Sequence, residues 1–213
     1  MSGVLIKGSL VHYETFGRGQ PILFIHGWLG SWRYWVPIME DLATDYRTYA
    51  LDLWGFGDSH QGAERYAVDD YVALVLDFMD ELGIWRSPLV GHTLGAAVAA
   101  KLAASQPDRV SRVLAIGLPL LAESINRRLL TSASNDALAR LFWHRQRTYA
   151  EVDLGIPKMA QNAVALTVQS VAGLDMGQIL AEIRAPLLTV YGDRDPVVSV
   201  DHIEALDKLP STA

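Results

Sequence analysis

The stretch LVGHTLGAAVAAKL, Leu89 to Leu102, decides how the rest of the chain is interpreted. Its first residues are apolar, as in a buried strand, and its last residues are rich in alanine, as in a helix. Between them, Gly91 and Gly95 flank Thr93 in a Gly-x-Thr-x-Gly turn. Because glycine permits a sharp bend, the pattern predicts a strand, a tight turn and a helix that hold the Thr93 side chain up at the carboxyl end of a sheet.

Outside this stretch, strand and helix signals alternate along the chain. An opening hairpin is predicted with its turn at Gly8–Ser9, and residues 21–27 form an apolar run typical of a strand buried on both faces. Ser31 is expected to cap one helix, and Asp69 to cap a longer one that Gly83 ends. This alternation is typical of the α/β class, with a mostly parallel sheet and helices on both faces.

Three regions are predicted from these signals. Residues 1–119 carry the first part of the α/β core. Residues 120–183 lose the strand rhythm and are rich in helix formers, so we expect a helical lid or cap insertion there. Residues 184–213 return to the core with a strand and an acidic turn. That second part is expected to be truncated, without a C-terminal strand and helix.

Composition narrows the possible partners. The chain has 213 residues, half of them hydrophobic, and a formal net charge of −6. No run of Lys or Arg offers the positive face that nucleic acids or anionic membranes require, so we expect a small-molecule ligand instead. The chain has no cysteine, and no sequence motif indicates a metal, a nucleotide or another cofactor. It also lacks a signal peptide and a stretch of roughly 20 apolar residues, which predicts a cytoplasmic protein.

Four motifs in order resemble the α/β-hydrolase fold superfamily, in its serine-hydrolase type. HGWLGS at 26–31 is similar to the oxyanion turn of that family, and DLWGFGDS at 52–59 to its D-x-x-G-x-G-x-S loop. GHTLG at 91–95 matches the nucleophile elbow G-x-S-x-G in all but the nucleophile, and GDRD at 192–195 is similar to the acid loop. The resemblance implies hydrolysis of carboxylic esters and related acyl bonds without a cofactor.

The resemblance assigns a role to each motif. Thr93 stands at the nucleophile position, and Asp195 at the position of the acid that orients a histidine base. The backbone N–H groups of Trp28 and Leu94 are expected to form the oxyanion hole, because preorganised amides at a helix N-terminus stabilise a developing negative charge. The residues expected to shape the site are His26, Gly27, Gly91, His92 and Gly95.

Two departures from the family pattern predict weak activity or none. Thr93 is β-branched, so the strained elbow costs more than it does for serine, and its methyl group crowds the path of attack. Only 18 residues follow Asp195, and a turn and one helix account for them. His202 lies within that helix, where the family carries no base. The catalytic triad is therefore expected to be degenerate, because an alcohol without a base is a poor nucleophile at neutral pH.

Several alternatives remain open at this stage. The chain is either a weak ester or acyl hydrolase, a non-catalytic ligand-binding or interaction protein on the same scaffold, or a fragment of a longer gene product. Chemistry on epoxides or halides is disfavoured, because those relatives place an aspartate where Thr93 stands.

Smaller features complete these expectations. Asp193 is expected to be exposed and Asp195 buried. In the insertion, His144 is expected to be solvated, and the pair Phe142–Trp143 either packs on its helix or lines a pocket. If the last strand is absent, the strand at residues 187–191 becomes the edge of the sheet, which predicts self-association through its unpaired backbone groups.

Overall fold

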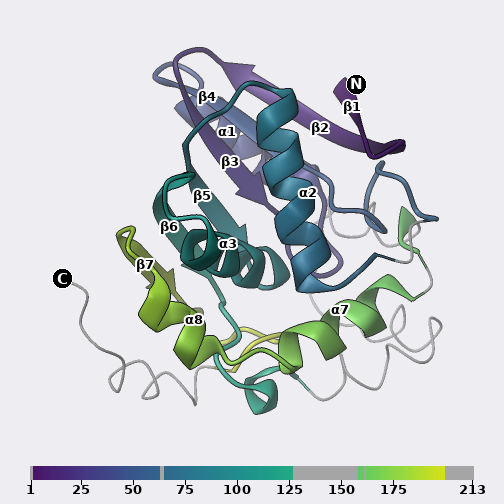
Figure 1. Cartoon of the computed structure of the whole chain (residues 1–213), viewed down its shortest axis with the longest axis vertical. Helices are drawn as coiled ribbons and strands as arrows, with labels where there is room; N and C mark the ends of the chain where they lie inside the picture. Colours follow the sequence, from purple (N-terminus) through teal and green to yellow (C-terminus); the bar gives the residue numbers. More distant parts are fainter. Residues whose placement is uncertain (1, 63–64, 127–157, 161, 200–213) are drawn as a thin grey trace.

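A seven-stranded sheet forms the centre of the structure, a computed structural model that describes residues 2–62, 65–126, 158–160 and 162–199 (Figure 1). In space the strands follow the order β1, β2, β4, β3, β5, β6, β7. Strands β3 to β7 are parallel, whereas β2 is antiparallel to both of its neighbours. The predicted α/β class is therefore confirmed. The strands are β1 (Ser2–Ile6), β2 (Ser9–Gly17), β3 (Gln20–Ile25), β4 (Tyr46–Leu51), β5 (Ser87–His92), β6 (Val110–Ile116) and β7 (Leu187–Val190).

Helices cover both faces of this sheet. Helix α1 packs against β2 and β4 on one face, whereas α2 and α3 pack together on the other, in front of the sheet in Figure 1. Helices α7 and α8 lie against α3. The helices are η1 (Trp32–Trp35), α1 (Val36–Leu42), α2 (Val68–Glu81), α3 (Leu94–Ser105), η2 (Ala122–Ser124), α7 (Ala163–Ala172) and α8 (Met176–Glu182), of which η1 and η2 are 3₁₀-helices.

The position of strand β3 between two layers of helices explains why its sequence is apolar without alternation. Leu23 and Ile25 belong to the large core beneath α2 and α3, while Ile22 and Phe24 belong to the smaller core beneath α1. Successive side chains of a strand point to opposite faces, so a strand between two helix layers needs apolar residues at every position.

The local turn signals are partly confirmed. The Ser31 hydroxyl accepts the amide of Arg33 and caps η1, and Gly83, with φ of 66°, ends α2 as predicted. The hairpin turn is Lys7–Gly8 rather than Gly8–Ser9, with positive φ at both residues, as a two-residue hairpin of type I′ requires. The predicted Asp69 cap is wrong. Helix α2 begins at Val68, and it is Asp70 whose carboxylate accepts the Ala67 amide at 3.0 Å.

Part of the predicted organisation lies outside the described residues. These include Phe142, Trp143 and His144 of the insertion, and His202 with the helix expected around it. The boundaries of the three regions accordingly stay predictions. In the described part of the chain, β7 stands at one edge of the sheet and β1 at the other.

No single helix in the described ranges is long and apolar enough to cross a membrane. Helices α7 and α8 reach that length and apolar character only as a pair, with a bend of 72° between them.

Two glycines let α3 press against the sheet. A Cβ atom at Gly95, in the first turn of α3, would overlap the carbonyl oxygen of Ile25 and lie 2.7 Å from that of His26. A Cβ atom at Gly91 would overlap the carbonyl of Gly95 itself. The Gly-x-Thr-x-Gly spacing therefore allows the helix to start directly beside β3 and β5.

This close approach predicts the effect of adding one methyl group. We expect Gly95→Ala to lower the free energy of unfolding by about 1–3 kcal/mol, because the backbone of β3 cannot move away cheaply. Gly177→Ala is the matched control, since Gly177 is also the second residue of its helix and its Cβ would meet only Asp175, at 3.4 Å. There the change should be neutral or stabilising by up to about 1 kcal/mol. Urea unfolding of both variants measures the difference, and equal stabilities would contradict the packing argument.

Candidate active site

Thr93 occupies the sharp bend between β5 and α3 in a conformation that a β-branched residue rarely adopts. Its φ is 46° and its ψ is −103°, and its side chain is almost fully buried. Such a backbone costs on the order of 1–3 kcal/mol and persists only where the surroundings enforce it. Here the Thr93 amide donates to the Ile116 carbonyl at 2.8 Å, and the Thr93 carbonyl accepts from Ala97 at 3.1 Å. These two bonds hold the bend between β6 and α3.

The turn after β3 points an amide at this residue. The backbone N–H of Trp28 donates to the Thr93 hydroxyl oxygen at 3.3 Å. Gly27 makes the approach possible, because a Cβ atom there would overlap the Thr93 hydroxyl and lie 2.8 Å from the His92 carbonyl. Leu94, the second predicted donor, is the first residue of α3 and is fully buried. Its amide is thus among those that a helix N-terminus leaves without an intrahelical partner.

The His26 side chain supports the turn after β3 through two hydrogen bonds. The amide of Leu53 donates to its Nε2 at 2.9 Å, so the ring proton is on Nδ1, which donates to the Gly27 carbonyl at 2.9 Å. Burial lowers the pKa of His26, although the charge of Asp52 and the hydrogen bond to Gly27 oppose that shift. The ring is neutral and both of its nitrogens are used, so it has no capacity left for proton transfer.

His92 contacts a tyrosine that the sequence did not single out. The Tyr34 hydroxyl accepts the Gly27 amide at 2.6 Å and lies 3.3 Å from Nδ1 of His92. Burial raises the pKa of Tyr34, so its hydroxyl keeps its proton and can share a hydrogen bond with Nδ1. Burial also lowers the pKa of His92, despite the nearby Asp195. Tyr34 thus ties the oxyanion turn to the residue before Thr93; its only sequence signal is its place in the helix that Ser31 caps.

Asp195 lies on the other side of Thr93. Its Oδ1 accepts the amides of Val197 at 2.7 Å and Val198 at 3.2 Å. A Cβ atom on Gly117 would lie 3.1 Å from Asp195 Oδ2 and 3.4 Å from the Thr93 methyl carbon. Gly117, which no sequence motif indicated, therefore leaves open the space that both Asp195 Oδ2 and the Thr93 methyl group border.

Of the two predicted side-chain exposures in the loop after β7, one is confirmed and the other is wrong. Asp193 is exposed as expected, but Asp195 is half-buried rather than buried. The reason is that its loop lies at the edge of the described sheet, where backbone amides cover only one carboxylate oxygen. Among the described residues, no histidine ring hydrogen-bonds the Thr93 hydroxyl or Oδ2 of Asp195.

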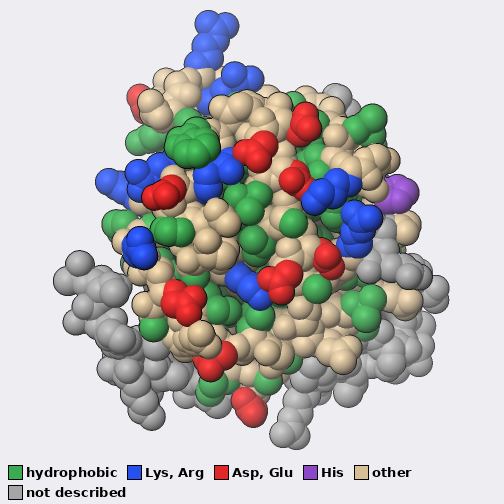
Figure 2. All heavy atoms as spheres, viewed as in Figure 1, with side chains coloured by type: hydrophobic (Ala, Val, Ile, Leu, Met, Phe, Trp, Pro, Cys, Tyr) green, Lys and Arg blue, Asp and Glu red, His purple; other side chains and the backbone are tan. Residues whose placement is uncertain are grey.

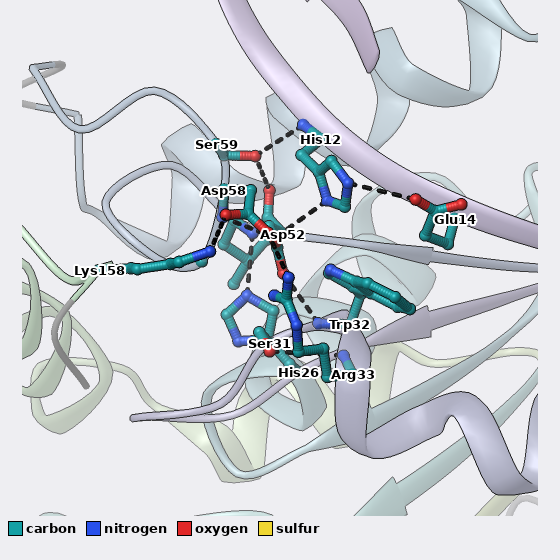
Figure 3. A network of polar contacts seen from close by, with 12 residues as sticks. His12, Glu14, His26, Ser31, Trp32, Arg33, Asp52, Asp58, Ser59 and Lys158 are labelled. Atoms are coloured by element: carbon teal, nitrogen blue, oxygen red, sulfur yellow. Dashed lines mark hydrogen bonds and ion pairs between the residues drawn. The ribbon is translucent and has the colours of Figure 1, made fainter. Parts of the chain in front are cut away.

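The loop after β4 carries a second polar cluster, around Asp52 (Figure 3). The buried Asp52 carboxylate accepts the amides of Trp32 at 2.8 Å and Asp58 at 2.9 Å, and lies 3.2 Å from Nδ1 of His12. Asp58 pairs with Arg33 at 2.9 Å and with Lys158. Burial works against the charge of Asp58, but hydrogen bonds from Lys158 and Arg33 outweigh it and lower its pKa.

This cluster has the residue types of a metal site. His12, Asp52 and Asp58 lie close enough together to hold a cation. Their carboxylates, however, already accept two backbone amides and pair with two basic side chains. The cluster is thus a charge-balanced brace between the loop and the helix that follows the oxyanion turn.

Comparison with known proteins identifies the family. Residues 20–155 match the family model described as alpha/beta hydrolase fold, and the chain belongs to that family. It is 29% identical, over 92% of its length, to the dihydrolipoyllysine-residue acetyltransferase component of the acetoin cleaving system of Pseudomonas putida, but spans only 58% of that protein. It is 34% identical, over 53% of its length, to epoxide hydrolase 4 of Mus musculus and spans 33% of it.

Other similar proteins are matched over most of their length. The pimeloyl-[acyl-carrier protein] methyl ester esterase of Vibrio campbellii is 28% identical over 95% of this chain and 87% of its own. The crystal structure of E-2-(acetamidomethylene)succinate hydrolase superposes with a TM-score of 0.81 at 22% identity, over 98% of this chain and 88% of its own. That likeness shows the shared fold.

The buried neutral state of His26 predicts a pH dependence of stability. The folded pKa of His26 lies below the unfolded value of about 6.5, so protons bind preferentially to the unfolded chain as the pH falls through that range. We expect His26→Gln to be less stable than the wild type at pH 7.5 and to lose less stability on going to pH 5. Each such group contributes up to about 1.4 kcal/mol per pH unit.

His60→Gln is the control for this measurement, because His60 is exposed. It should keep the wild-type pH dependence. Denaturant unfolding at several pH values gives the slope of the free energy of unfolding against pH for the wild type, His26→Gln and His60→Gln. A His26→Gln slope equal to that of the wild type would mean that this ring already binds a proton in the folded state.

Proposed function

We propose that this chain binds a small uncharged acyl compound, such as a carboxylic ester, at the oxyanion turn and hydrolyses it far more slowly than a serine elbow would. The observation that carries the proposal is the 3.3 Å contact between the Trp28 amide and the Thr93 hydroxyl. It aims a preorganised backbone donor at the residue that stands where the family places its nucleophile, next to the N-terminus of α3.

The proposed roles follow from this arrangement. Thr93 is the attacking alcohol, the amides of Trp28 and Leu94 stabilise the oxyanion, and Asp195 is the acid that would orient a base. His26, Gly27, Gly91, His92 and Gly95 shape the site by setting the turn and the elbow. The esterase from Vibrio campbellii, similar over most of both chains, supports an ester as the substrate class.

Slow turnover is proposed for two physical reasons. The β-branched side chain has few rotamers in a backbone held at φ of 46°, so it reaches the attacking position with difficulty. In the described ranges, the Thr93 hydroxyl contacts no imidazole that could take its proton. Without a base the hydroxyl stays protonated at neutral pH, and the oxyanion donors alone supply only part of the rate.

A second candidate function is non-catalytic ligand binding or interaction. The specific observation in its favour is that the Thr93 hydroxyl accepts the Trp28 amide, as a structural group would. Its signature is thermal stabilisation by short-chain acyl compounds without release of product.

Substitution of Thr93 tests the proposed hydrolysis. On a p-nitrophenyl ester, we expect Thr93→Ser to raise kcat/KM over the wild type by about two- to tenfold, because the restricted rotamer costs roughly 0.5–1.5 kcal/mol. Thr93→Ala should abolish the residual rate. Three indistinguishable rates would exclude Thr93 as the nucleophile and favour the binding candidate. A rapid wild-type rate lost in Thr93→Ala would instead contradict slow turnover.

We also propose that the chain self-associates through strand β7. In the described sheet this strand is an edge, and Leu188 and Val190 are 62% and 43% exposed. Beside it lies an apolar groove of about 330 Å³, lined in part by Val90, Leu114 and Leu188. Unpaired backbone groups next to exposed apolar side chains favour strand pairing with a second copy.

Sedimentation velocity over a range of concentrations tests this association. We expect the wild type to form dimers or larger species as concentration rises, and Leu188→Lys to remain monomeric, because a charge on an edge strand opposes pairing. Leu5→Lys is the control at the opposite edge, on β1, where Leu5 is 67% exposed. A wild-type monomer at all concentrations would exclude the proposal.

A further inference from the structure

The turn after β3, which carries the proposed oxyanion donor Trp28, is held by a segment within the predicted insertion. This return segment comprises residues 158–160 and 162–172 and includes α7. The indole Nε1 of Trp28 donates to the Thr167 hydroxyl of α7 at 2.9 Å, and both side chains are buried. The single Thr167 hydroxyl proton points back to the carbonyls of Ala163 at 2.7 Å and Val164 at 2.9 Å, so its oxygen is free to accept.

This contact constrains the residue whose backbone amide faces Thr93. An indole N–H is a donor only, and a buried one without an acceptor is destabilising by about 1–3 kcal/mol. The observed orientation of Trp28, with its ring toward α7, is therefore favoured over one that leaves Nε1 without an acceptor. Because the indole and the amide belong to the same residue, fixing the ring restricts the direction of the backbone N–H toward the Thr93 oxygen.

A second connection joins the turn after β3 to the return segment, through the loop after β4 (Figure 3). Arg33, which follows the oxyanion turn, and Lys158, which begins the return segment, reach the Asp58 carboxylate from either side. The Ala160 amide donates to the Gly55 carbonyl at 2.8 Å in the same loop. The Asp58 side chain is only 19% exposed, so water screens these ion pairs incompletely.

We propose that the return segment sets the direction of the Trp28 amide, with Thr167 as the positioning residue and Asp58 as the bridge that keeps the segment in register. Thr167 acts through Trp28 and not on a ligand. The inference rests on the proposed function only in taking this amide as an oxyanion donor. It gives part of the predicted insertion a role at the elbow: any displacement of α7 is transmitted to the turn after β3.

Amide hydrogen exchange and NMR test the contact without relying on activity. Thr167→Val preserves side-chain shape but removes the acceptor. We expect it to shift the Trp28 indole resonance, one of six in the chain, and to accelerate exchange of the Trp28 amide by roughly tenfold or more. Thr167→Ser should restore both values. Thr48→Val is the matched control, because Thr48 is equally buried and its hydroxyl donates to Phe16, remote from the site.

A separate variant tests the Asp58 bridge. Asp58→Asn removes both ion pairs at constant volume and should also accelerate exchange of the Trp28 amide. Asp69→Asn is its control, because Asp69 pairs with Lys101 but is 74% exposed. If Thr167→Val leaves Trp28 exchange at the wild-type rate, or if Thr48→Val accelerates it as much, the proposal is overturned.

A kinetic measurement separates positioning from general stability. In the Thr93→Ser chain, adding Thr167→Val should lower kcat on a p-nitrophenyl ester by about tenfold with little change in KM, because a misdirected donor weakens transition-state stabilisation. Thr167→Ser should recover the rate, and Thr48→Val should not affect it. If kcat is unchanged while the amide exchanges faster, the positioning role is wrong. If Thr93→Ser hydrolyses no ester, the proposed function fails, and the exchange measurements still decide the inference.

Discussion

The close approach of α3 to strand β3 is the constraint on which the rest of the structure depends. Gly95 places the first turn of α3 directly against the carbonyls of Ile25 and His26, so the helix starts where the turn after β3 begins. This contact forces the chain at Thr93 into a left-handed conformation. It also brings the Trp28 amide to the Thr93 oxygen. Strain at one residue is thus stabilised by packing and backbone hydrogen bonds around it.

The polar groups around the elbow form connected structural braces. His26 links the turn after β3 to Leu53, Tyr34 links it to His92, and Asp52 links the following helix to the loop after β4. In each case a buried or half-buried side chain satisfies a backbone amide that secondary structure leaves unpaired, as burial requires. The imidazoles of His26 and His92 are held neutral by burial and belong to this framework. Thr93 is therefore enclosed by groups whose hydrogen-bonding capacity is already largely used.

Sequence predicts features whose cause is local. The sharp strand-to-helix turn at Thr93, the Ser31 cap and the Gly83 helix stop depend on residues within a few positions of one another, and all three are found. The Asp69 cap failed because the helix already begins at Val68, which places Asp69 inside the first turn, where Asp70 reaches back to the Ala67 amide. Thr167 was missed for a different reason: its partner Trp28 is 139 residues away, and a threonine within an apolar helix carries no signal of what it accepts. Asp195 was expected to be buried, but its burial depends on neighbours at a sheet edge that spacing cannot describe.

The orientation of the threonine side chain has a consequence for ligand entry. The Trp28 amide carries one proton, and in the structure the Thr93 oxygen already receives it, while the methyl group faces Gly117 and the acid loop. In the proposed function, an incoming carbonyl would have to compete with this internal acceptor, and the hydroxyl leaves only by rotation about χ1, which β-branching hinders. The Trp28 amide is already paired within the molecule. Under that proposal, affinity for an acyl compound would reflect an exchange between two acceptors, and a compound with no hydrogen-bond acceptor could not drive that exchange.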